Sequence, residues 1–199
     1  MLLNELRLRI IEEFIIDYKI QLTGSYIAEK KGFNQKSVSN ALLELEKEGF
    51  LKSKSSGKNK LFSMNLDNKE NIINFISAVE HLRIIMFYNK NTLIKEIAGK
   101  IKESCSGIIL IFGSYAKNKQ KKDSDLDVFV AGKVNSKKID QLSEIYRISI
   151  NVKNYPISIF EKNLRANDIL LNEIKKDHVI ISGAEKFVSV MSGFENENN

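Results

Sequence analysis

Residues 108–131 read IILIFGSYAKNKQKKDSDLDVFVA, and this stretch decides the fold of the chain. Its first five residues form a continuous apolar run, which is typical of a strand buried on both faces. Gly113 and Ser114 end the run, and Gly113 permits a sharp turn and the close approach of a ligand. The residues after the turn are expected to begin a helix, whose free N–H groups suit a phosphate. The stretch therefore predicts strand, turn, short helix, loop and second strand.

The second half of this stretch carries two carboxylates at strand spacing. Asp125 and Asp127 alternate with Leu126 and Val128, so strand periodicity places both acids on one face. Neighbouring carboxylates repel each other unless a hard cation such as Mg²⁺ lies between them. We therefore predict that Asp125 and Asp127 form a magnesium site.

The spacing of Gly113-Ser114 from Asp125-Leu126-Asp127 resembles that of the DNA polymerase beta-like nucleotidyltransferase superfamily, and of its small minimal nucleotidyltransferases above all. The resemblance extends over about residues 90 to 191. It implies transfer of a nucleoside monophosphate from Mg-NTP, with ATP as the first candidate, to an acceptor hydroxyl. Asp125 and Asp127 would be the catalytic metal ligands. The nucleotide contacts that it implies are Gly113, Ser114, Lys117 and Ser124.

The family's third carboxylate normally lies on a neighbouring strand and helps to activate the acceptor hydroxyl. The strand predicted to carry it covers residues 157–160, where the matching position is Ser158. A serine is a poor metal ligand and is no base at neutral pH. The acceptor stays open between a small molecule and a protein, as in antitoxins that adenylylate a partner toxin.

The N-terminal third predicts a compact helical domain with a basic hairpin. Helical spacing covers residues 3–20, and two helices are expected at about residues 25–31 and 35–48, the second capped by Asn34. Residues 52–63 read KSKSSGKNKLFS and predict two short strands around a turn. This order resembles the winged helix-turn-helix domain of bacterial and archaeal transcription regulators. The alternative is a dimerisation or protein-contact module.

The winged-helix resemblance implies DNA contacts from two elements. The second helix of the motif would enter the major groove, and the hairpin would touch phosphates. Base readers are then expected at Gln35, Lys36, Ser39 and Asn40, and phosphate contacts at Lys52, Lys54, Lys58 and Lys60. Two functions follow: an active nucleotidyltransferase with a nucleic-acid-binding arm, or a catalytically impaired, nucleotide-sensing transcription regulator.

The remaining pattern predicts an α+β protein whose small mixed sheet is covered by helices. Residues 66–104 predict two helices, and 148–152 are ambiguous between a helix end and a strand. Further helices are expected at 136–147, 163–175 and 184–191, and a short strand at 178–183. The expected domains are a winged helix at 1–66, a connecting helix at 67–89, a nucleotidyltransferase-like domain at 90–194 and a disordered tail at 195–199.

Composition indicates which partners and which cellular compartment to expect for this protein. The 199 residues are 43% hydrophobic and 28% charged, and their formal net charge of +6 favours nucleic acid or nucleotide phosphates as partners. No apolar run approaches the roughly 20 residues that span a membrane. The single Cys105 cannot form an internal disulfide, so a cytoplasmic location is the expectation. A winged helix and a long apolar helix together suggest a homodimer, which a mass measurement in solution would test.

Overall fold

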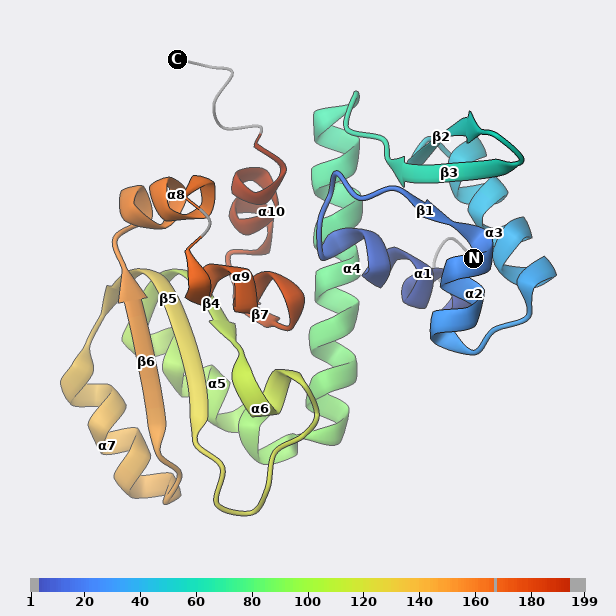
Figure 1. Cartoon of the computed structure of the whole chain (residues 1–199). Helices are drawn as coiled ribbons and strands as arrows, with labels where there is room; N and C mark the ends of the chain where they lie inside the picture. Colours follow the sequence, from blue (N-terminus) through green and yellow to red (C-terminus); the bar gives the residue numbers. More distant parts are fainter. Residues whose placement is uncertain (1–3, 167, 194–199) are drawn as a thin grey trace. The chain divides into compact units, whose positions relative to one another are not determined.

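A computed structural model describes residues 4–166 and 168–193 of the chain (Figure 1). The chain divides into two compact units, Met1–Val79 and Glu80–Asn199. The boundary falls inside helix α4 (Lys69–Lys90), where the sequence predicts the connecting helix. The predicted tail, residues 195–199, lies outside the described residues, as does the last residue of the predicted transferase domain. Within the described ranges, no helix is both long enough and apolar enough to cross a membrane.

The N-terminal unit combines helices with a small antiparallel sheet. The side chains of Thr23 and Asn34 cap two of its helices by accepting hydrogen bonds from backbone N–H groups, and Gly32 ends the first of these two helices in a left-handed conformation. Strand β3 lies between β1 and β2. The two helices predicted at 25–31 and 35–48 and the hairpin are confirmed, whereas the first helix ends at Ile15, before the predicted end at residue 20, and residue 3 lies outside the described residues. The elements that precede α4 are α1 (Glu5–Ile15), β1 (Leu22–Thr23), α2 (Gly24–Lys31), α3 (Gln35–Lys47), β2 (Leu51–Ser56) and β3 (Asn59–Met64).

The C-terminal unit is built on a four-stranded sheet in the order β6-β5-β4-β7. Strands β5 and β6 are parallel, and the other neighbouring pairs are antiparallel. The sheet is therefore mixed, as the sequence predicts. Its elements are α5 (Thr92–Ser104), β4 (Cys105–Ile111), α6 (Gly113–Ala116), β5 (Leu126–Val134), α7 (Ser136–Tyr146), β6 (Ile150–Tyr155), α8 (Ile157–Arg165), α9 (Ile169–Lys176), β7 (Val179–Ser182) and α10 (Ala184–Ser192).

Helices cover both faces of this sheet (Figure 1). Leu126, Val128 and Val130 pack with apolar residues of α5 and α7 in one core. Phe129 and Ala131 pack with apolar residues of α8, α9 and α10 in the other. Because side chains alternate along a strand, Asp127 shares the face of Phe129. Asp127 thus lies at the end of the face that α8, α9 and α10 cover.

Two of the predicted elements are wrong. Residues 157–160 begin helix α8 rather than forming a strand, and the helix predicted over 163–175 is divided between α8 and α9. The apolar residues Ile157, Phe160 and Leu164 recur at helical spacing and pack into one core, which overrides the short alternation of the ISIF sequence. The ambiguous residues 148–152 lead into strand β6, which ends just before Pro156.

Candidate active site

Three strands bring the predicted motif together at one end of the sheet. Asp127 is the register partner of Asn151 on β6. The backbone N–H of Phe112 donates a 3.0 Å hydrogen bond to the Asp127 carbonyl oxygen. On the other side of β4, Ile111 pairs with Val179, the first residue of β7. The turn after β4, the first residues of β5 and β6, and the chain entering β7 therefore meet at this edge.

Gly113 makes a turn that an L-amino acid with a side chain would strain. Its φ of 69° lies in the left-handed region. A Cβ atom at this position would collide with Oδ2 of Asp127. Glycine therefore lets the turn lie directly against the carboxylate, and the sharp turn predicted at this residue is present.

The two aspartates form a carboxylate pair whose negative charge the neighbouring residues only partly compensate. Asp125 is exposed and accepts a 3.1 Å hydrogen bond from Nδ2 of Asn151. Burial raises the pKa of Asp127, and the charges of Asp125 and Glu173 raise it further. The Asn151 amide and the charge of Lys153 act in the opposite direction. A bound cation would relieve both the burial penalty and the repulsion.

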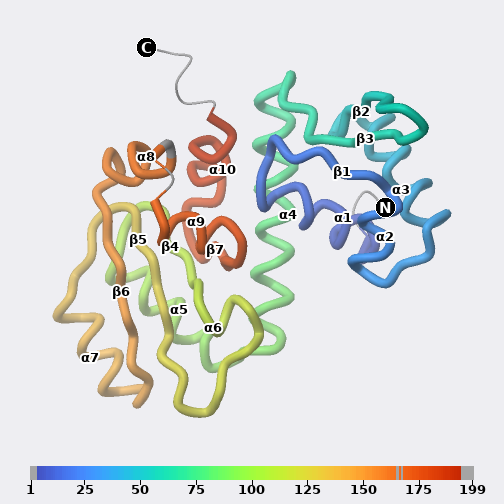
Figure 2. The backbone as a smooth tube through the Cα atoms, in the orientation of Figure 1, coloured from blue at the N-terminus to red at the C-terminus, as the bar shows by residue number. Residues whose placement is uncertain are grey.

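The segment between β4 and β5, whose course is visible in Figure 2, carries the other predicted nucleotide contacts: Ser114 lies in α6, and Lys117 and Ser124 lie in the loop after it. Ser124 closes the loop, because its hydroxyl accepts a 2.8 Å hydrogen bond from the backbone N–H of Lys121. Ser114 is partly buried, and its carbonyl oxygen accepts a bond from the N–H of Lys119. Nζ of Lys117 lies 4.0 Å from Oε1 of Glu173 on α9. Ser124 thus fixes the chain entering β5, whereas Lys117 is tied to α9.

Residues 93–186 match the family model described as "Polymerase beta, Nucleotidyltransferase". This part of the chain is a nucleotidyltransferase domain of the polymerase beta type. The structure titled "Crystal structure of the toxin-antitoxin with AMP-PNP" is similar to the chain at 18% identity and a TM-score of 0.34, over 54% of this chain and 86% of that chain. No curated protein matches the chain.

Nucleotidyltransferases of this type generally depend on a divalent metal ion, and the residues at the edge of the sheet fit one. Mg²⁺ is usually held by one or two carboxylates together with substrate phosphates and water. Asp125 and Asp127 supply two carboxylates, and Asn151 adds an amide beside them. No group of three or more His, Cys, Asp or Glu side chains that could hold a metal occurs among the described residues. The donor set therefore suits a metal that arrives with its nucleotide.

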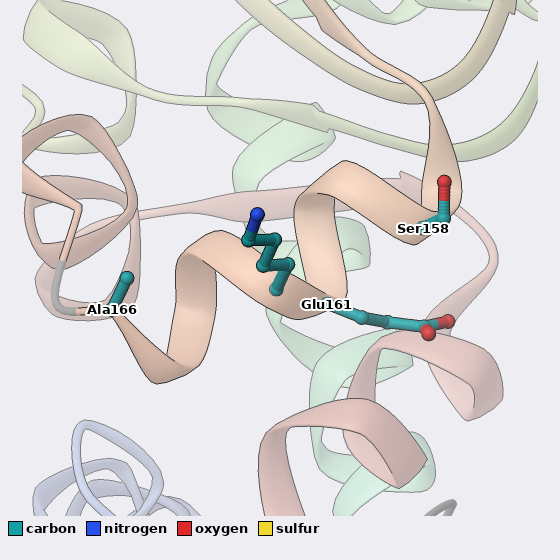
Figure 3. Close-up of a pocket in the computed structure, with 4 residues that line it drawn as sticks. Ser158, Glu161 and Ala166 are labelled. Carbon is teal, nitrogen blue, oxygen red and sulfur yellow. The ribbon is translucent and has the colours of Figure 1, made fainter.

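The strand next to β5 is β6, where the residue beside Asp127 is Asn151; Ser158, which was predicted for a neighbouring strand, lies on a helix instead. Ser158 lies on α8 after the far end of β6, and a rise of about 3.3 Å per residue puts roughly 13 Å of strand between Asn151 and Tyr155. Ser158 instead lines a hollow of about 440 Å³ with Glu161, Lys162 and Ala166 (Figure 3). Apolar and polar residues alternate over residues 150–153, which is the sequence signal for β6.

The predicted base readers of the N-terminal unit share one exposed surface on α3. The opposite face of the helix is buried through Val38, Leu42 and Leu45. Asn34 caps the helix, so this surface begins in its first turn. Each of the four predicted side chains is exposed, namely Gln35, Lys36, Ser39 and Asn40.

The four hairpin lysines fall into two classes. Lys52 pairs with Asp67 at 3.0 Å, and Lys60 pairs with Glu46 at 2.7 Å. Lys54 and Lys58 are exposed and have no ion pair or hydrogen bond with any described residue. Lys54 and Lys58 are therefore the hairpin charges left available for an anionic partner.

The acidic residues on the later turns of α3 are neutralised within the unit. Arg7, whose side chain is only 6% exposed, contacts Glu44 at 2.6 Å and Glu48 at 3.0 Å. A hydrogen bond from Lys60 lowers the pKa of Glu46, and a hydrogen bond from Ser53 acts in the same direction. The negative charge of these turns is thus countered before any partner arrives.

Proposed function

We propose that this protein transfers a nucleoside monophosphate from Mg-NTP, with ATP as the first candidate, to an acceptor hydroxyl. The observation that carries the proposal is the contact between the Gly113 turn and the Asp127 carboxylate, next to Asp125. A turn that admits only glycine, pressed against an acid pair, suits a triphosphate whose charge a metal ion shares. The match of residues 93–186 to a nucleotidyltransferase family supports the same reaction.

Each residue of the proposed site has a distinct task. Asp125 and Asp127 would hold Mg²⁺, which supplies charge stabilisation at the phosphates when it is bound. Gly113 and Ser114 would hold the β- and γ-phosphates through backbone N–H groups and the serine hydroxyl. Lys117 adds a positive charge beside them. Ser124, through its bond to the N–H of Lys121, would keep the loop closed and Asp125 in place.

The chemistry replaces one phosphorus–oxygen bond with another. The acceptor oxygen forms a bond to the α-phosphorus of the NTP. The bond between the α-phosphorus and the bridging oxygen breaks, and pyrophosphate leaves. The proton of the acceptor hydroxyl must pass to a base. Asn151 cannot take it, because an amide is not protonated at neutral pH.

One observation favours a second function. Asn151 stands where an active enzyme of this type is expected to carry its third acid. A domain that binds Mg-NTP without turnover would act as a nucleotide sensor. Joined to a DNA-binding unit, it would make the protein a transcription regulator.

We further propose that the N-terminal unit is a winged helix that binds DNA. Its order of helix, strand, two helices and hairpin supports this assignment, as do the exposed polar surface on α3 and the free Lys54 and Lys58. The contacts of Arg7 with Glu44 and Glu48 reduce the repulsion that phosphates would otherwise meet. Lys54 and Lys58 would contact phosphates, and Gln35, Lys36, Ser39 and Asn40 would face the bases.

Incubation with each of the four NTPs, labelled at the α-phosphate, tests the transferase proposal. Wild-type protein with Mg²⁺ should release pyrophosphate and leave labelled product. The Asp125→Ala/Asp127→Ala double variant should do neither. Binding of Mg-ATP without release of pyrophosphate, in the presence of total cell extract as the source of acceptors, would select the sensor. Absence of binding would refute both functions of this domain.

A further inference from the structure

We propose that Glu173 is a catalytic residue that accepts the proton of the acceptor hydroxyl. This inference rests on the proposed nucleotidyl transfer. It assigns to a helix the task that a third carboxylate on β6 would otherwise perform. Neither the motif nor the strand pattern points to Glu173, because it lies 46 residues after Asp127 in a helix that precedes the last strand.

The sheet register brings Glu173 to the end of the sheet where the motif lies. Helix α9 ends at Lys176, and β7 begins at Val179, which pairs with Ile111 on β4. The C-terminal end of α9 therefore enters the sheet next to the turn that Gly113 makes. In α9, Leu171 and Ile174 are buried in the same core as Phe112. These contacts fix α9 against the end of the sheet that carries Asp127.

The side chain of Glu173 is exposed to solvent and lies beside a residue of the proposed nucleotide site. It is 62% exposed, whereas its neighbour Ile174 is buried. Its Oε1 atom lies 4.0 Å from Nζ of Lys117, one of the residues proposed to hold the nucleotide. Glu173 thus lies beside the segment that connects the two halves of the motif.

The environment of Glu173 suits a base that works only when nucleotide is present. An exposed ion pair contributes about 0.2–1 kcal/mol, so the charge of a triphosphate can draw Lys117 away at little cost. Glu173 would then take the proton from the acceptor oxygen. That oxygen forms its bond to the α-phosphorus as pyrophosphate departs. Asn151 meanwhile holds Asp125 through its amide.

The test compares Glu173→Gln with Glu144→Gln in the full chain. Glu144 is an exposed acid on α7, which packs on the opposite face of the sheet. Two activities are measured for each: Mg-ATP binding by calorimetry, and conversion of α-labelled ATP to AMP and pyrophosphate with water as the acceptor. We expect Glu173→Gln to keep its affinity within about threefold and to lose turnover by about 10²- to 10⁴-fold. Glu144→Gln should resemble the wild type.

Turnover in Glu173→Gln that equals that of the wild type, with equal Mg-ATP binding, would overturn the proposal.

The outcomes also separate this inference from the proposed function. Wild-type protein that binds no Mg-ATP refutes the nucleotide site itself and, with it, the role of Glu173. Wild-type protein that binds Mg-ATP but never cleaves it refutes Glu173 as a base and leaves the nucleotide-sensing function. Cleavage by the wild type and not by Glu173→Gln, with equal binding, supports both.

Discussion

Gly113 and Asp127 lie directly against each other, and this contact depends on Gly113 having no side chain. The left-handed turn brings the backbone of Gly113 against the carboxylate, leaving no room for a Cβ atom. Elsewhere in the chain, Gly32 has nearly the same φ, 68° against 69°, but nothing lies within 4 Å of where its Cβ would be. Substituting each of the two glycines therefore distinguishes the effect of backbone strain from the effect of a collision with the Asp127 carboxylate.

We predict that Gly113→Ala abolishes Mg-ATP binding, whereas Gly32→Ala leaves it intact. Alanine in the left-handed region costs about 1–2 kcal/mol of stability at either position. Only at residue 113 does the new methyl group also displace Asp127. Urea denaturation and calorimetric titration of both variants check the two effects. Equal ATP affinity in the two variants would show that the close contact has no role in binding.

The raised pKa of Asp127 predicts how metal binding depends on pH. Burial first, and then Asp125 and Glu173, favour the protonated acid in the metal-free protein. A divalent cation binds the ionised form, so binding releases a proton at any pH at which Asp127 is still protonated. We expect the affinity for Mg-ATP to rise with pH through the raised pKa of Asp127 and to level off above it. Calorimetry in buffers of different ionisation enthalpy measures that proton release.

The positions of Asn151 and Glu173 beside the motif could not be predicted from residue patterns. The Gly-Ser and Asp-x-Asp motif lies within one hairpin, so its geometry is local and the sequence predicts it. The neighbours of Asp127 depend on register across strands and on the position of α9. A serine at residue 158 and an asparagine at residue 151 are equally plausible from spacing alone. Only the pairing of β5 with β6 selects Asn151.

Among the elements, α4 is anchored to the C-terminal unit by a buried group of charges. Arg83 donates two hydrogen bonds, of 2.8 and 2.7 Å, to the carboxylate of Glu80, which is 1% exposed. Arg83 also donates to the carbonyl oxygen of His178, and Nε2 of His178 lies 3.5 Å from Glu80. Burial alone would raise the pKa of Glu80, but the charges of Arg83 and His178 hold it below its ordinary value.

We predict that Glu80→Gln destabilises the protein by about 3 kcal/mol, because it leaves the partly buried charge of Arg83 uncompensated. Glu103→Gln removes a partner of Lys100 in an exposed ion pair and should change stability by less than about 1 kcal/mol. Urea denaturation of both variants at neutral pH measures the difference. Similar losses would mean that the buried group contributes no more than a surface pair.

The same group sets a direction for the pH dependence of stability. A carboxyl group whose pKa is lowered in the folded state binds protons less readily there than in the unfolded state. Its contribution is complete above the unfolded pKa and disappears as the pH falls through the folded pKa. Acid should therefore destabilise the wild type more steeply than Glu80→Gln. Denaturation midpoints at a series of acidic pH values test this, and parallel curves would count against it.

The hairpin of β2 and β3 yields a prediction about DNA. Among the described residues, Lys54 and Lys58 have no ion-pair partner, whereas Lys52 and Lys60 have carboxylate partners. Each lost phosphate contact should reduce the salt dependence of binding by about 0.9 in a log–log plot. Lys54→Ala/Lys58→Ala should thus lower the slope by about 1.8 on random-sequence duplex DNA. Lys52→Ala/Lys60→Ala should lower it less, and a reversed order would contradict the proposed phosphate contacts.

The sequence predicted helix ends correctly where a local residue signal marks them. It failed where tertiary packing decides whether a segment forms a strand or a helix. Asn34 and Gly32 mark helix ends through their own side chain and backbone, and those ends were predicted. The start of α8 has no side-chain cap hydrogen bond. Its apolar residues suit a strand over four positions and a helix over nine. The core formed with α9 and α10 selects the helix.

At the scale of the whole molecule, we predict that the two units have separable activities. The proposed nucleotide site lies within residues 80–199, and the proposed DNA contacts lie within residues 1–79. Asp125→Ala/Asp127→Ala should therefore keep the wild-type affinity for random-sequence duplex DNA without nucleotide. Lys54→Ala/Lys58→Ala should keep the wild-type affinity for Mg-ATP. Filter binding and calorimetry on both variants check this, and loss of both activities in either variant would contradict it.

The measurement that tests the central claim most directly is a calorimetric titration of Mg-ATP into the wild type and into Asp125→Ala/Asp127→Ala. The account predicts saturable binding to the wild type that requires Mg²⁺ and is absent from the double variant. Binding that persists without Mg²⁺, or that survives in the variant, would contradict a metal–nucleotide site at these acids. A wild type that binds none of the four NTPs would refute the site altogether.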